Sequence, residues 1–200
     1  MNIDSFFSGD TELTKFSILT AASFMALTAC GGTSTPLSFA EIDKEGLALS
    51  REIFETTYTD PSTLPTTGHA VYDGYMAATI ADQYTVAGDL EMRANFANGG
   101  SFSGSVTNIV GEDESAYNGQ LTLSNGAIDS GANPDTEWTY GMDMTGTLSG
   151  DQGSVVVNAG LLGDFSGTKH EYVDGAVVGS VEIDGQVQQI TDGGFVGEIR

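Results

Sequence analysis

Hydrophobic and polar residues alternate with a period of two over most of the chain from Gly68 onward. In DLEMRANF, residues 89–96, one face carries Leu90, Met92, Ala94 and Phe96, and the other face is polar. The segment EWTYGMDMTGTL, residues 137–148, alternates in the same way. This period is typical of half-buried antiparallel strands, because successive side chains of a strand point to opposite faces. The pattern predicts eight strands, over residues 70–80, 89–96, 101–110, 120–123, 137–148, 153–168, 176–183 and 194–199.

Short segments rich in glycine and aspartate separate these strands and predict turns. They are NGG at 98–100, GEDES at 111–115, SGDQG at 149–153, DG at 174–175 and TDGG at 191–194. Strands joined by short turns form an up-and-down meander, and eight such strands close into a barrel that leaves no exposed edge. The predicted fold class is therefore all-β: a soluble eight-stranded antiparallel up-and-down barrel.

The polar side chains predict which side of this barrel is apolar. The face opposite the Leu90 and Met92 set carries Asp, Glu, Arg, Asn and Thr. A barrel that spans a membrane presents apolar side chains to the lipid instead. We therefore expect an apolar interior and a hydrated exterior. The interior of an eight-stranded barrel is either filled by side chains or holds one small ligand.

A segment with helical spacing precedes the barrel. Between residues 37 and 60 the apolar residues follow a period close to that of a helix, interrupted by Gly46, and predict one or two short helices. Pro61 and Pro65 close this region. We divide this part of the chain into a helical and linker segment, residues 37–65, and a barrel domain, residues 66–200.

The N-terminal part of the chain has the features of a targeting signal. Residues 16–29 carry no charge and follow Lys15, which fits the apolar region of a signal peptide and is too short for a membrane span. The following LTAC, residues 27–30, resembles the bacterial lipobox, which implies cleavage before Cys30 and lipidation of its thiol. The alternative is a buried free cysteine. We expect a signal peptide at 1–29, a lipidated tether at 30–36 and an outer-membrane, lipid-anchored location, at the cell surface or on the periplasmic face.

The charge before this apolar run departs from a normal leader. Asp4, Asp10 and Glu12 precede Lys15, whereas the start of a signal peptide is usually positive. We hypothesise that translation starts near residue 13. Removal of residues 1–29 changes the formal net charge from −22 to −20. A protein with this much negative charge repels nucleic acid. Its acidity indicates either binding of cationic solutes or adaptation to a salty medium. Cys30 is the single cysteine, so we expect no disulfide and no zinc cluster.

The last two thirds of the chain resemble a known family. LGDFSGTKHEYVDGAVVGSVEIDG followed by GGFVGEIR resembles the end of the β-barrel domain of the transferrin-binding protein B superfamily. LPTTGHAVYDGY and DLEMRANFANGGSFSGSV resemble its opening strands, so the resemblance covers roughly residues 66–200. It implies an outer-membrane lipoprotein that binds a solute or a partner protein in iron or nutrient uptake. The implied partners are an outer-membrane receptor or a secreted carrier protein.

Few residues are candidates for catalysis or for binding a metal ion or haem. His69, His170 and the nearby Tyr172 are candidate metal or haem ligands, and the alternative is that they are solvated turn residues. Oxygen ligands in GEDES and in residues 129–137 do not have the spacing of a calcium loop. The sequence contains no nucleophile elbow, phosphate loop or cysteine cluster. We therefore predict no enzyme activity and name no cofactor.

Two other functions remain open. The first is a lipocalin-like carrier that holds a small apolar molecule inside the barrel. Its cavity would be lined by inward side chains, for which the candidates are Trp138, Tyr140, Met142 and Phe165, although such residues more often fill a core. The second is a structural or adhesive envelope lipoprotein without a solute.

Overall fold

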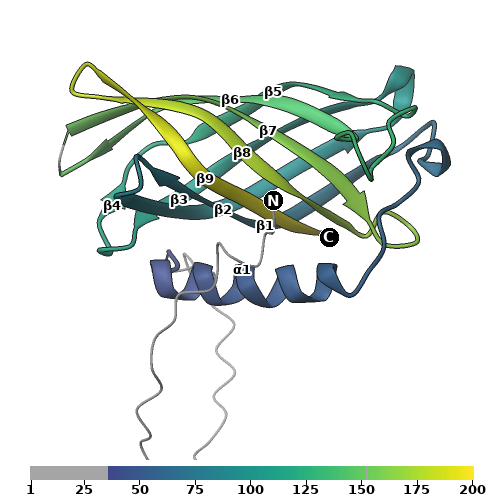
Figure 1. Ribbon diagram of the computed structural model, residues 1–200, viewed down its shortest axis with the longest axis horizontal. Coiled ribbons are helices and arrows are strands. Elements are labelled where there is room, and N and C mark those ends of the chain that lie inside the picture. The colour runs from purple at the N-terminus through teal and green to yellow at the C-terminus, as the bar shows by residue number, and fades with distance from the viewer. Residues whose placement is uncertain (1–35, 152) are drawn as a thin grey trace, which may run out of the picture.

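A closed eight-stranded antiparallel barrel forms most of the molecule, as Figure 1 shows. This computed structural model describes residues 36–151 and 153–200. The strands are β1 (His69–Ile80), β2 (Tyr84–Asn95), β3 (Ser101–Gly111), β4 (Ala116–Tyr117), β5 (Leu121–Ile128), β6 (Tyr140–Gly150), β7 (Gly153–Ser166), β8 (Tyr172–Ile183) and β9 (Gln186–Ile199). β4 is a two-residue strand paired with β3. The other eight form an up-and-down meander, which the pairing of the first strand, β1, with the last, β9, closes. The predicted all-β fold, an eight-stranded antiparallel up-and-down barrel, is confirmed.

The alternation seen in the sequence corresponds to the two faces of the barrel wall. Alternate residues of each strand enter one continuous hydrophobic core, which includes Leu90, Met92, Met144 and Phe165. The apolar interior is therefore confirmed, and each predicted strand is present with longer or slightly shifted bounds.

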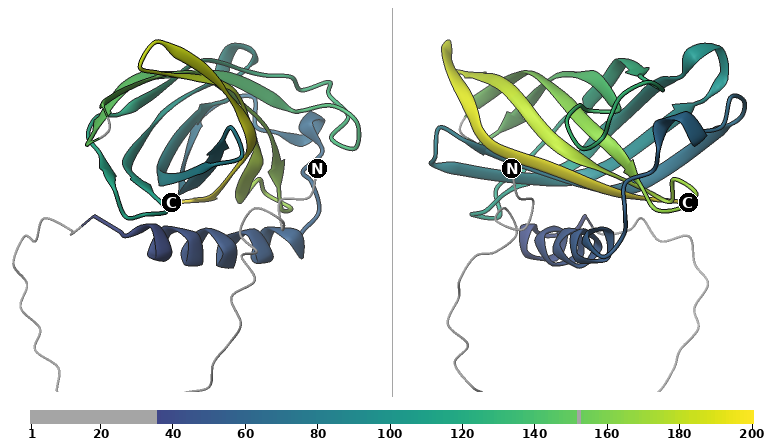
Figure 2. Two further views of the ribbon diagram at one scale, coloured as in Figure 1. Left: turned by 60° about the vertical axis from the view of Figure 1, so that its left-hand side comes forward. Right: turned by 45° about the vertical axis from the view of Figure 1, so that its right-hand side comes forward.

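The α-helix of the described residues, α1 (Phe39–Phe54), lies across the outside of the barrel (Figure 2). It begins at Ser38, whose side chain and the side chain of Glu41 form a reciprocal capping box. Ile42 is fully buried against Ala77 of β1 and Ala87 of β2. The prediction of one or two helices resolves to one, because Gly46 lies within α1 and is itself buried there.

The two ends of the barrel differ. One, which we call the closed end, lies where the chain enters β1 and where the β2–β3, β5–β6 and β7–β8 connections run. Here the ring of Phe165 lies 5.5 Å from that of Phe102 and 5.3 Å from that of Tyr140, and Phe96 and Tyr72 pack around it. These rings fill the barrel at this end. The other, the open end, carries the β1–β2, β6–β7 and β8–β9 hairpins.

Two predicted turns are wrong. Asp174 and Gly175 lie within β8, and residues 191–194 lie within β9. Gly175 is needed there for a different reason: a Cβ on it would overlap the backbone carbonyl of Leu162 on β7. The true β8–β9 turn is formed by a second Asp-Gly pair, Asp184 and Gly185, both with positive φ.

Candidate functional site

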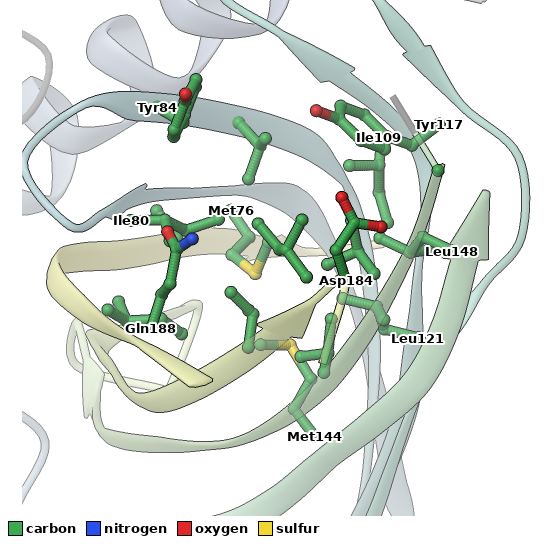
Figure 3. Close-up of a pocket in the computed structure, with 18 residues that line it drawn as sticks. Met76, Ile80, Tyr84, Ile109, Tyr117, Leu121, Met144, Leu148, Asp184 and Gln188 are labelled. Carbon is green, nitrogen blue, oxygen red and sulfur yellow. The ribbon is translucent and has the colours of Figure 1, made fainter. Parts of the chain in front are cut away.

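A cavity lies inside the open end of the barrel, and Figure 3 shows the side chains that converge on it. Its volume is about 240 Å³. Its lining residues come from all nine strands, so it is part of the barrel interior rather than a surface groove. The apolar wall consists of Met76, Ala78, Ile80, Val86, Ile109, Leu121, Met144, Leu148, Val155, Val157, Val181, Ile183 and Ile190.

The kind of side chain explains why the barrel is filled at one end and hollow at the other. The closed end receives a cluster of packed aromatic rings, whereas the apolar part of the cavity wall receives mainly branched aliphatic side chains and two methionines. An eight-stranded barrel is just wide enough for side chains to fill it or to leave room for one small ligand, and here the smaller aliphatic side chains leave space that the rings fill at the closed end. Methionine adapts its shape to irregular contents, because its side chain is unbranched and flexible.

The size of the cavity limits what it holds. An apolar protein cavity of about 150 Å³ stays dry and binds benzene. By that comparison, 240 Å³ suits a molecule of about ten non-hydrogen atoms. The cavity is smaller than most pockets that hold a drug-sized molecule, which begin at about 300 Å³.

Polar groups occur only toward the mouth of this cavity. Tyr84 and Tyr117 bring hydroxyl groups, Gln188 an amide and Asp184 a carboxylate. Asp184 lies in the β8–β9 turn, and a Cβ built on Gly153 at the start of β7 would lie 3.2 Å from its Oδ1. The carboxylate therefore sits between two hairpins at the rim.

The residues proposed from the sequence as a cavity lining take other positions. Tyr140, Met142 and Phe165 are buried in the hydrophobic core, and none of them lines the cavity. Trp138 precedes β6 and is 44% exposed. For Tyr140, Met142 and Phe165 the structure shows the alternative, that such residues fill the core, and only the inward position expected for Trp138 is wrong. Alternation identifies the inner face of a strand but not the depth along the barrel. The sequence signal that could have located the mouth is the Asp184-Gly185 pair, because it forms the β8–β9 turn at the open end.

The candidate metal ligands do not come together. His69 is exposed at the start of β1. The ring of His170 packs edge-on against Phe96 at 5.3 Å, and burial lowers the pKa of His170. The Tyr172 hydroxyl instead donates to Glu52 of α1 at 2.8 Å. Within residues 36–151 and 153–200, no group of three or more His, Cys, Asp or Glu side chains is placed to hold a metal ion.

Two buried carboxylates form a separate polar cluster on the outer wall. Asp164 of β7 and Asp174 of β8 are directly opposed and are 3% and 4% exposed. Asp164 accepts from the Thr139 hydroxyl at 2.6 Å, and Asp174 accepts from the Ser166 hydroxyl at 2.8 Å. Burial, reinforced by the neighbouring Asp164, raises the pKa of Asp174 to about 6. Each carboxylate has a hydroxyl partner, and the chain before β1 pairs with the end of β7 nearby through Thr59.

Comparison with models of protein families, with curated proteins and with solved structures found no match to this chain. Among the helices that the structure describes, none has the length and hydrophobicity needed to cross a membrane. Cys30 and the predicted signal peptide lie outside the described residues.

Proposed function

We propose that this protein is a carrier that holds one small apolar molecule in the cavity at the open end of its barrel. The observation that supports this best is the cavity itself, of about 240 Å³, whose wall is apolar except for the polar side chains toward its mouth. Binding would be driven by transfer of apolar surface out of water.

The LTAC segment at 27–30 supports the second part of the proposal, in which the carrier is an envelope lipoprotein anchored through Cys30. Two or more lipid chains hold a protein stably on a membrane, whereas one chain gives only marginal binding. Mass spectrometry of the protein from its own cells tests this part. An acylated Cys30 at the N-terminus supports it, and a Cys30 without lipid overturns it.

Binding of neutral probes tests the carrier function. 1-Octanol and naphthalene each have about ten non-hydrogen atoms, which is the size inferred for the cavity. We expect both to bind the barrel in isothermal titration calorimetry, with a negative heat-capacity change that reports burial of apolar surface. If neither probe binds, the carrier function is overturned.

A pair of adjacent valines provides a matched control. Val155 lines the cavity, whereas the next residue, Val156, is 44% exposed on the outer face. Val155→Phe places a ring in the cavity, and we expect it to weaken binding of both probes at least about tenfold. Val156→Phe adds the same ring outside and leaves both affinities unchanged. Equal effects of the two variants would show that the probes bind elsewhere.

The resemblance to the transferrin-binding protein B superfamily supports a second proposal, in which surface loops bind a partner protein in iron or nutrient uptake. In that case Val155→Phe would leave partner binding intact. Capture of an outer-membrane receptor or a secreted carrier by both valine variants alike, without binding of either neutral probe, would favour this second proposal.

A further inference from the structure

Carboxylates surround the mouth of the cavity. The β1–β2 turn carries Asp82, the β6–β7 turn carries Asp151 and the β8–β9 turn carries Asp184. The β3–β4 connection adds three more acids, Glu112, Asp113 and Glu114. The residues that flank these turns, such as Ile80 and Ile183, line the cavity. The acids are therefore arranged around its opening on four different connections.

No lysine or arginine occurs among the described residues that line the cavity or form these four connections. The cations of the described chain lie elsewhere. Arg93 and Arg200 form ion pairs with carboxylates of β1 and β2, and Lys169 lies in the β7–β8 connection at the closed end. Lys44 is on the part of α1 that begins beside the open end, but it pairs with the adjacent Glu45 at 3.4 Å, and Arg51 is in the last turn of α1. The carboxylates at the mouth are thus not neutralised by neighbouring cations.

This arrangement selects among apolar molecules by their polar end. A charged group does not enter an apolar cavity without a partner, because its desolvation is too costly. It must remain at the mouth, where carboxylates of several turns create a negative potential. That potential attracts an ammonium group and repels a carboxylate. Salt at about 0.1 M screens it with a length of about 10 Å.

We propose that the carried molecule has a small apolar body and a positively charged amine end, with the body in the cavity and the amine at the mouth near Asp184. This inference rests on the carrier function proposed above and adds the chemical class of the molecule. It excludes fatty acids of the same size.

Three probes with the same alkyl chain test this inference: octylamine, 1-octanol and octanoate. We expect octylamine to bind about tenfold more tightly than 1-octanol at low salt, and octanoate about tenfold more weakly. Both differences should shrink in 0.5 M salt, where the screening length is only about 4 Å. Titration calorimetry at pH 7.5 on the complete barrel with α1 gives all three affinities.

Two triple variants of equal charge show where any preference arises. Asp82→Asn, Asp151→Asn and Asp184→Asn together neutralise the mouth, and asparagine tolerates the positive φ of residues 82 and 184. The control, Glu55→Gln with Asp135→Asn and Glu198→Gln, removes three exposed acids away from the mouth. We expect the mouth variant to reduce the ratio of octylamine to octanoate affinity at least about tenfold and the control to leave it nearly unchanged.

The outcomes separate this inference from the proposed function. If 1-octanol binds as tightly as octylamine, or if both triple variants act alike, the amine preference is overturned while the carrier function stands. If none of the three probes binds, both are overturned.

Discussion

Replacement of Asp174 by asparagine tests the account of the buried carboxylates most directly. Asp174 is almost fully buried, its pKa is raised from 3.8 to about 6 by burial and by Asp164, and its Oδ1 accepts from the Ser166 hydroxyl. Asparagine keeps an acceptor oxygen for Ser166 and removes the charge. The variant therefore isolates the cost of ionising a carboxyl group at this place.

The magnitude follows from the two pKa values. The folded state binds the proton more tightly than the unfolded state, because the folded pKa of about 6 lies above 3.8. Asp174 therefore lowers the free energy of unfolding as the pH rises from about 4 to 6, and the full cost persists above that window. At about 1.4 kcal/mol for each pH unit, this cost is about 3 kcal/mol at pH 8 and about 1.5 kcal/mol at pH 5.

Urea unfolding followed by circular dichroism at several pH values between 5 and 8 measures this effect. We expect Asp174→Asn to be more stable than the parent by about 3 kcal/mol at pH 8, with the advantage falling to about half at pH 5. Glu182→Gln, on the exposed part of the same strand, is the control and should change stability by less than about 0.5 kcal/mol. A constant difference between Asp174→Asn and the parent at every pH would refute the reasoning.

Three further substitutions test other parts of the structure by the same unfolding measurement. Tyr140→Phe should raise stability by about 1 kcal/mol, because the Tyr140 hydroxyl is buried and has no hydrogen-bond partner among the described residues; a loss of stability would show that a partner exists. Gly175→Ala should cost about 3 kcal/mol or more, because its methyl group overlaps the carbonyl of Leu162; a neutral effect would contradict the close approach of β7 and β8. Ile42→Ala should cost about 3 kcal/mol if α1 is packed firmly on the barrel, and a loss below about 1 kcal/mol would mean that it is not.

The barrel was predictable from the sequence because its physical cause is local. Residues such as Leu90 and Met92 recur at every second position, and this period requires a two-faced sheet. The two Asp-Gly pairs show where local reasoning fails. Asp174-Gly175 has the same residues as the true turn at Asp184-Gly185, but its aspartate is buried beside Ser166 and its glycine faces the backbone of β7.

The cavity was less predictable than the barrel. Whether an inward residue fills the core or borders a space depends on its neighbours across the barrel, and these come from distant parts of the chain. Met142 and Met144 illustrate this, since they are two residues apart on the same face of β6. Met142 packs into the filled core, whereas Met144 borders the cavity.

The position of α1 has a consequence for how a carried molecule is exchanged. The helix begins beside the open end, where the backbone N–H of Phe39 donates to Glu114 at 3.1 Å (Figure 1). The chain between Cys30 and Phe39 spans at most about 30 Å even when fully extended. With the proposed anchor at Cys30, the mouth of the barrel would stay within about one bilayer thickness of the membrane surface. An amphiphilic molecule that leaves the lipid would then meet the opening over a short path, and release back into the same bilayer would keep its apolar body out of water.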